Sequence, residues 1–261
     1  MNFHRIYAVI LRHLYAFRKN LDRLTDVFYW PLVDLLLWGL TGVFIEKQTA
    51  SIPSLALMLI SGTIFWLIVW RGCAEITIST LSELWDKNLI NLFVTPLKFS
   101  EWMTAFLFLS VMKALVSFLF GVGIAFLLYK LRLLLYGFYL LPFILILLTN
   151  GWSVGFFVAG LVLRYGAKAQ NLAWTAVYVL SPFVAIFYPV SVLPSWAQRI
   201  ASIIPASHIF ESMRIIISNG TLDPRELYLA GILSILYLLL SLIFLYKSFQ
   251  KALRRGLVGL H

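Results

Sequence analysis

Residues 140–148 read LLPFILILL, and residues 236–245 read LYLLLSLIFL. These nearly continuous runs lack the alternation of apolar and polar residues that is typical of strands in a membrane β-barrel. They fit helices that cross a bilayer, which need about 20 mostly apolar residues. Four further stretches are similar, so the sequence predicts six spans, at Val27–Ile45, Leu55–Ser79, Trp102–Tyr129, Phe138–Leu163, Leu172–Val190 and Leu227–Tyr246.

The composition of the whole chain agrees with this pattern. Of the 261 residues 61% are hydrophobic and 12% are charged, and the mean hydropathy is +0.91. Soluble domains are roughly 45–50% apolar and about 25% charged. A soluble enzyme of this size would expose large apolar patches. The sequence therefore predicts an all-α integral membrane protein with one transmembrane domain over residues 1–261.

The positive charge of the chain indicates its orientation. The net charge is +10, and most of the 21 Lys and Arg residues flank the two termini and the loops after the second and fourth spans. An excess of basic residues marks the cytoplasmic side, so both termini are predicted to be cytoplasmic and nucleic-acid binding is not expected. The single cysteine, Cys73, forms no internal disulfide, and no Cys/His cluster predicts a metal site. No removable signal peptide is expected.

The first 25 residues form an amphipathic pattern when they are placed on a helix. Basic and apolar residues occupy opposite sides, with Arg5, Arg12, Lys19 and Arg23 on one and Ile6, Ile10, Leu14, Phe17, Leu21 and Leu24 on the other. This pattern predicts a helix at the membrane interface. The polar face could also contact a cytoplasmic partner.

The loop at residues 80–101 predicts a short cytoplasmic helix. Its apolar residues recur at helical spacing, and Glu83, Asp86, Lys87, Asn88 and Asn91 fill the remaining surface. Pro96 would end this helix near Thr95. Either a partner or the membrane interface could cover the apolar side.

The predicted outer loop, residues 190–222, overlaps a segment that is too broken to span the membrane. Four prolines, Pro182, Pro189, Pro194 and Pro205, divide Ser181–Arg214, which stays apolar around Trp196 and Ile200. Short re-entrant helices that dip into the outer leaflet would satisfy both features, provided that protein covers the non-helical backbone.

Two segments carry a resemblance to a known family. Pro189-Val190-x-x-Leu193-Pro194-x-Trp196-x-x-x-Ile200-Ala201-x-x-x-Pro205, followed by Glu211 and Arg214, resembles the outer-loop signature of ABC-2 type transporter permeases. The segment LFVTPL at residues 92–97 is similar to the cytoplasmic LLVTPL element of that family.

The resemblance implies an exporter in a prokaryotic cell membrane. Two permease subunits, identical or related, would pair with two cytoplasmic ATP-binding subunits and move a glycan, a lipid-linked molecule or a drug outward. The resemblance implies a coupling helix whose contacts with the ATPase subunit are Glu83, Asp86, Lys87, Asn88, Asn91, Thr95 and Pro96. It implies an outer gate formed by Pro189, Leu193, Pro194, Trp196, Pro205, Glu211 and Arg214.

Catalytic motifs are absent from the sequence. It contains no GxxxxGK[ST], GxSxG or HExxH run. No catalytic residue, metal or cofactor is therefore predicted on this chain, and ATP and Mg²⁺ would bind to the partner subunit. The alternatives are a membrane-embedded lipid-modifying enzyme, a passive channel or an ion-coupled carrier, although a carrier usually has broken helices in both halves.

Four ionisable residues lie within the predicted spans: Asp34, Arg71, Glu75 and Lys113. A charge in the bilayer usually pairs or faces water. At about 1.5 Å per residue, Asp34 and Arg71 lie about 10 and 12 Å from the cytoplasmic side. We therefore expect Asp34 to pair with Arg71, or alternatively with Lys113, and Glu75 could pair with Arg71 within one helix. These residues form either a packing ion pair or the inner vestibule of a pathway.

Several aromatic residues lie deep in the spans, namely Trp38, Trp66, Trp70, Trp152 and Trp174. Their rings could face lipid, or could line a pathway and stack on sugar rings or apolar drugs. The Gly151-x-x-x-Gly155 pattern predicts close packing between helices.

Overall fold

The computed structural model describes residues 1–19, 21–48, 54–86, 88–220, 222 and 224–254. Within these ranges the chain is helical, with no strand, as predicted. The elements are α1 (Phe3–Lys19), α2 (Leu21–Gln48), α3 (Leu55–Trp85), α4 (Leu89–Val94), α5 (Phe99–Tyr129), η1 (Leu133–Tyr139), α6 (Leu140–Tyr165), η2 (Gly166–Ala169), α7 (Gln170–Val184), η3 (Val190–Val192), α8 (Ser195–Ala201), α9 (Pro205–Asn219) and α10 (Pro224–Arg254).

Five segments among the described residues are long and apolar enough to cross a membrane. They are the part of α2 from Thr25, α3, α5, α6 together with η1, and α10. Helices α8 and α9 meet at an angle of 99° and would add a sixth only if they were counted as one broken span. The multi-pass architecture is therefore confirmed.

The fifth predicted span, Leu172–Val190, is shorter in the structure. Helix α7 has 15 residues and ends at Val184. At about 1.5 Å per residue this is about 22 Å, less than the roughly 30 Å of a hydrocarbon core. The chain leaves the helix where Pro182 removes a main-chain donor and Ala185 has a φ of 56°. The hydropathy of the segment continues past this point, but the helix does not.

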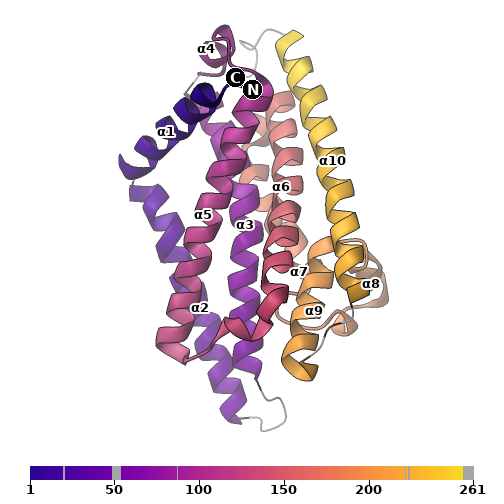
Figure 1. Cartoon of the computed structure of the whole chain (residues 1–261). Helices are drawn as coiled ribbons and strands as arrows, with labels where there is room; N and C mark the ends of the chain where they lie inside the picture. Colours follow the sequence, from indigo (N-terminus) through magenta and orange to yellow (C-terminus); the bar gives the residue numbers. More distant parts are fainter. Residues whose placement is uncertain (20, 49–53, 87, 221, 223, 255–261) are drawn as a thin grey trace.

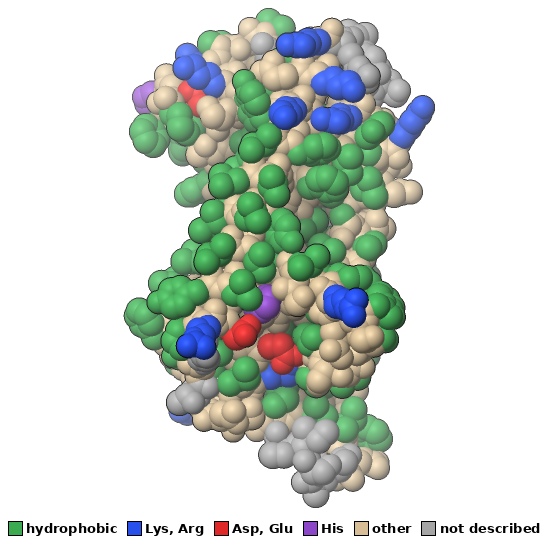
Figure 2. Space-filling model, turned by 90° about the vertical axis from the view of Figure 1, so that its right-hand side faces the viewer, with side chains coloured by type: hydrophobic (Ala, Val, Ile, Leu, Met, Phe, Trp, Pro, Cys, Tyr) green, Lys and Arg blue, Asp and Glu red, His purple; other side chains and the backbone are tan. Residues whose placement is uncertain are grey.

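The long helices form a bundle around α3, which is the most buried of them (Figure 1). Helices α1 and α4 and the end of α10 lie at one end of the bundle, and α8 and α9 lie at the other. Figure 2 shows a belt of hydrophobic side chains below a group of Lys and Arg side chains at the α4 end. The basic end therefore coincides with the end that holds α1 and α4, as the charge pattern predicts.

Two glycines allow α6 to approach α3 closely. A Cβ atom on Gly151 would lie 2.4 Å from the carbonyl oxygen of Val69. One on Gly155 would lie 3.1 Å from the carbonyl oxygen of Cys73. A larger residue at Gly151 would collide with α3 and one at Gly155 would be tightly confined, so the predicted packing role of this pair is confirmed.

Helix α1 has two apolar faces. Ile6, Val9 and Ile10 are buried in the same cluster as Trp102 and Phe106 of α5. A second stripe, which includes Phe3, Tyr7 and Tyr15, is exposed. The single amphipathic helix expected over residues 1–25 ends instead at Lys19, and α2 begins at Leu21.

Candidate functional site: a central cavity and its charged partition

A cavity of about 650 Å³ lies between α2, α3 and α7 and is closed at one side by residues 186–188. On α2 the cavity is lined by Pro31 and by a regular series of four residues, Asp26, Trp30, Asp34 and Trp38. Their spacing of four residues places all of them on one face of the helix. The sequence of α2 therefore builds a wall of alternating carboxylates and indoles.

Helices α3 and α7 supply the other aromatic walls. Trp66 and Trp70 line the cavity from α3, and Trp174 and Tyr178 line it from α7. The rings of Trp70 and Tyr178 lie 5.1 Å apart, which joins the two helices. Most of the deep tryptophans singled out in the sequence thus share one cavity.

Two other aromatic contacts define its borders. Phe187 stacks on Trp38 with ring centroids 4.0 Å apart, so the segment after α7 is held against α2. Trp152 points elsewhere, because its indole N–H donates to the Ser110 hydroxyl of α5 at 2.9 Å.

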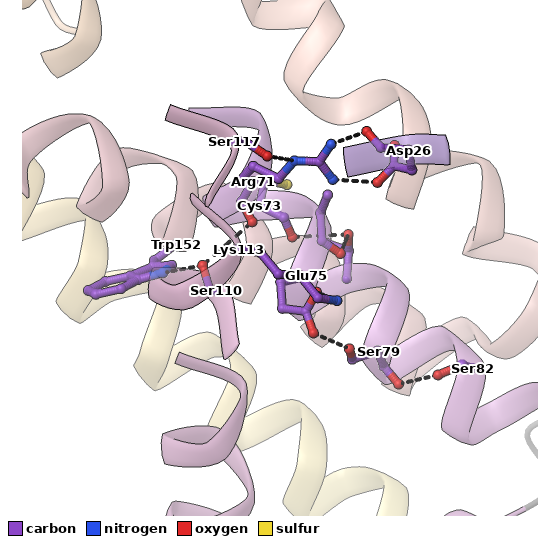
Figure 3. Close-up of polar contacts among 12 residues, drawn as sticks. Asp26, Arg71, Cys73, Glu75, Ser79, Ser82, Ser110, Lys113, Ser117 and Trp152 are labelled. Carbon is purple, nitrogen blue, oxygen red and sulfur yellow. Dashed lines mark hydrogen bonds and ion pairs between the residues drawn. The ribbon is translucent and has the colours of Figure 1, made fainter. Parts of the chain in front are cut away.

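Arg71 holds α3 to α2 and α5. Its guanidinium donates to both the carboxylate and the main-chain carbonyl of Asp26, and its Nε donates to the Ser117 hydroxyl at 3.0 Å (Figure 3). Arg71 is only 4% exposed. A buried guanidinium is tolerated when its charge and its donors are both satisfied, and Asp26 and Ser117 meet these requirements.

A second ion pair lies one turn further toward the α4 end. The ammonium of Lys113 is 2.5 Å from the carboxylate of Glu75, which also accepts a hydrogen bond from the Ser79 hydroxyl at 3.2 Å. Lys113 lies 5.0 Å from the centre of the Phe17 ring, which links α5 to α1. The membrane-embedded part of the bundle thus contains two ion pairs, each joining different helices.

These ion pairs line a smaller cavity of about 260 Å³ at the α1 side of the large one. Asp26, Trp30, Arg71 and Trp174 line both cavities. They form a partition between the two spaces. The partition consists of one ion pair and two indole rings, all carried by α2, α3 and α7.

The expected pairing of Asp34 is wrong. Arg71 bonds to Asp26, and Lys113 bonds to Glu75. Gly42 of α2 lies against Ala56 of α3, and in this antiparallel pair the register places Arg71 beside Val27 and Asp26, about two turns from Asp34. Asp26, Trp30 and Ser117, which the sequence reasoning did not single out, complete the site. In the sequence, the four-residue spacing of Asp26, Trp30, Asp34 and Trp38 could have indicated that these side chains share one face of α2.

Glu83, an expected contact of the ATPase subunit, lies inside α3 and is buried. Its carboxylate forms an ion pair with Arg12 of α1, lies 3.3 Å from the Nε2 atom of His13, and accepts a hydrogen bond from Asn88 at 2.9 Å. Partial burial lowers the pKa of Arg12, and the nearby Asp86 carboxylate opposes this shift. In this structure Glu83 therefore fastens α1 to the end of α3.

The other expected contacts differ in exposure. Asp86, Asn91, Thr95 and Pro96 are exposed, and Asn88 is half-buried. The carbonyl of Pro96 accepts a hydrogen bond from Arg5 of α1. Lys87 lies outside the described residues.

The expected outer-gate residues cluster around the short helices at the opposite end. Four of them bound these helices: Pro189 precedes η3, Leu193 and Pro194 separate η3 from α8, and Pro205 begins α9. Trp196 of α8 is exposed. The short helices separated by prolines are therefore present.

An arginine of α9 holds the turn after α7. Arg214 donates to the carbonyls of Ala185 at 2.6 Å and Ile186 at 3.2 Å, and lies 3.3 Å from Glu211. The Glu211 carboxylate also accepts a hydrogen bond from the amide of Val190. These bonds connect the outer loop to the wall of the central cavity, because Ile186 lines that cavity.

The family model described as ABC-2 type transporter matches residues 14–218. This range includes every residue named for the cavity, the partition and the outer loop. A comparison with curated proteins returned no match.

Proposed function

Because the chain belongs to the ABC-2 type transporter family, we propose that it is the membrane-spanning subunit of an ATP-driven exporter. Membership of the family makes it a transport permease component of a membrane. The direction of transport, the partners and the pathway are the substance of the proposal.

The observation that carries the proposal is the series of two cavities divided by the Asp26–Arg71 partition. The smaller cavity lies toward α1 and α4, and the larger one reaches the turn that Arg214 holds. A substrate that moves between them must pass an ion pair and two indole rings. Such a partition would open only when α2, α3 and α7 move relative to one another.

The α4 end offers a surface for the partner that would drive this movement. Trp85 and Val94 are 50% and 81% exposed there, beside the polar residues Asp86 and Asn91. Large apolar side chains exposed at the basic end of the molecule favour a protein contact. We propose that two cytoplasmic ATP-binding subunits, which hold ATP and Mg²⁺, dock on α4 in a pair of permeases.

The side of the large cavity supports a second permease subunit. Trp30, Trp174 and Tyr178 are 57%, 42% and 56% exposed in the single chain. A second copy or a related chain would cover these rings and close the pathway. In the complete complex α7 would be the sixth crossing, because the chain passes from one end of the bundle to the other between α6 and α8 (Figure 1). Both termini would lie in the cytoplasm of a prokaryotic cell.

Purification of the tagged protein from its native membrane in mild detergent tests this function. We expect an ATP-binding subunit to co-purify with ATPase activity, and we expect both to be lost when residues 88–91 are scrambled. The absence of any ATPase, even after crosslinking, would overturn the proposal and favour a carrier or a lipid-modifying enzyme.

A further inference from the structure

Asp34 is the one lining carboxylate of the large cavity that has no hydrogen bond or ion pair with any residue that the structure describes. It is half-buried in the middle of α2. An ionised group at this depth of a membrane normally finds an opposite charge or water. Asp34 thus has no partner among the residues that the structure describes.

The other charges of the cavity and three of its hydroxyls are already committed. Arg71 and Asp26 neutralise each other. The hydroxyls of Thr63, Ser181 and Tyr188 donate to main-chain carbonyls at 2.9, 2.8 and 2.6 Å. The cavity therefore carries a net negative charge, and that charge belongs to Asp34.

Aromatic rings surround this charge. The cavity is lined by Trp30, Trp38, Trp66, Trp70, Trp174 and Tyr178. Aromatic faces attract organic cations through the ring quadrupole, and Trp is the most effective side chain. A carboxylate among indole rings combines the two features that recognise a substituted ammonium group.

We propose that the large cavity binds an amphipathic organic cation, with its ammonium group at Asp34 and its apolar body among the indole rings. This inference rests on the proposed function and names the substrate class of that permease. The volume of about 650 Å³ suits one molecule of drug size. A metal ion is a poorer occupant, because hard cations require several oxygen ligands and one free carboxylate is present among the lining residues described.

A neutral sugar is also a poorer occupant. Sugar rings can stack on indoles, but they would leave the Asp34 charge uncompensated, and three of the cavity hydroxyls already donate to main-chain carbonyls. An anion is disfavoured because Asp26 occupies the guanidinium of Arg71. The charge of the cavity thus decides between ligands that its shape alone would accept.

The test uses the full chain in nanodiscs of uncharged phosphatidylcholine and a matched pair of probes. The first probe is a dansyl-labelled undecyl trimethylammonium, and the second carries a tert-butyl group in place of the trimethylammonium. Energy transfer from tryptophan to dansyl reports binding. We expect saturable binding of the cation and affinity about tenfold weaker for the neutral isostere.

Two substitutions on α2 separate a specific site from a general effect of charge. Asp34→Asn should weaken binding of the cation by about tenfold and leave binding of the isostere unchanged. Glu46→Gln removes the same charge near the far end of α2, where Glu46 accepts hydrogen bonds from the amides of Ser54 and Ala56, and should change neither. Trp70→Leu should weaken binding of the cation by about three- to tenfold. This second variant tests the inference if Asp34→Asn does not fold.

Equal affinity for the two probes, or for the cation with and without Asp34, would overturn the inference. Tighter binding of a dansyl-undecyl maltoside than of the cation would overturn it in favour of a glycan. Co-purification of the ATPase is measured separately. A permease that recruits its ATPase but ignores the cation refutes only the substrate class, whereas cation binding without an ATPase partner refutes the transport mechanism.

Discussion

Arg71 donates hydrogen bonds to both the carboxylate and the main-chain carbonyl of Asp26, which lies 45 positions earlier in the chain. The same guanidinium reaches Ser117 of α5. One side chain therefore fixes three long helices where the two cavities meet. The bonds to Asp26 and Ser117 compensate the buried charge of Arg71. Its burial therefore depends on these bonds more than on the apolar side chains around it.

Arg71→Gln should lower the free energy of unfolding by about 1–3 kcal/mol, because it leaves the Asp26 carboxylate without its partner. Arg71→Lys keeps the charge but loses the fork geometry, so it should recover only part of the loss. The double variant Asp26→Asn, Arg71→Gln should be more stable than Arg71→Gln alone, since no unpaired charge remains. Denaturation of the purified protein in detergent compares the wild type with Asp26→Asn, Arg71→Gln, Arg71→Lys and the double variant. Strictly additive losses would show that the two side chains act independently.

The approach of α6 to α3 gives a prediction with an internal control. Gly151→Ala places a Cβ atom 2.4 Å from the carbonyl oxygen of Val69 and should destabilise the protein by about 1–3 kcal/mol. Gly231 in α10 has no atom within 4 Å of the corresponding position. Gly231→Ala should therefore be neutral or stabilising by up to about 1 kcal/mol. The melting temperatures of the two variants provide the comparison, and similar values would contradict the close packing.

The helical bundle follows from sequence patterns, but its charge pairing does not. Hydropathy predicts the long helices because about 20 apolar residues must be shielded from water. The pattern Gly151-x-x-x-Gly155 predicts a close helix contact because only small residues allow it. Counting residues from the predicted span ends fails to predict the partner of Arg71, because the observed register of α2 against α3 places Arg71 beside Asp26 and not beside Asp34. Both Asp26 and Asp34 lie on the face of α2 that lines the cavity. Only the tilt and register of the helices therefore decide which of them pairs with Arg71.

The limits of the helices are a second feature that hydropathy does not predict. Helix α3 continues six residues past the predicted end at Ser79, which carries Glu83 into the helix and under α1. Helix α7 ends six residues before the predicted end at Val190, because of the turn at Ala185. In both cases a distant segment contacts the end of the helix, since Arg12 of α1 pairs with Glu83 and Arg214 of α9 donates to the carbonyl of Ala185. Such contacts are invisible in a local pattern.

The contact between α1 and Glu83 should hold α1 in place at the α4 end of the bundle. Glu83→Gln keeps the size of the side chain but removes the charge that pairs with Arg12 and lies beside His13. We expect faster hydrogen–deuterium exchange in α1 and a smaller yield of co-purified ATPase. Glu226→Gln, at the opposite end of the bundle, should leave both quantities unchanged. Unaltered exchange in α1 would show that its apolar face against α5 suffices to hold it.

Arg214 should control the order of the turn that separates the central cavity from the outer loop. It satisfies the carbonyls of Ala185 and Ile186 and lies against Glu211, which in turn accepts the amide of Val190. In Arg214→Lys a single ammonium group cannot reproduce the hydrogen bonds of the planar guanidinium to two carbonyls and a carboxylate. We expect faster exchange of the amides at residues 186–194 and a loss of about 1–3 kcal/mol in stability.

The matched control for this turn is Arg199→Lys, since Arg199 is an exposed arginine of α8 in the same outer region. It should leave both the exchange rates and the stability unchanged. If Arg214→Lys behaves like this control, the turn is ordered by its own packing. If exchange rises at residues 186–194 without a change in α10, Arg214 acts locally on the outer wall of the cavity. In that case, and provided that the proposed exporter assembles, transport should fall while the ATPase subunit still co-purifies, because the α4 end is untouched.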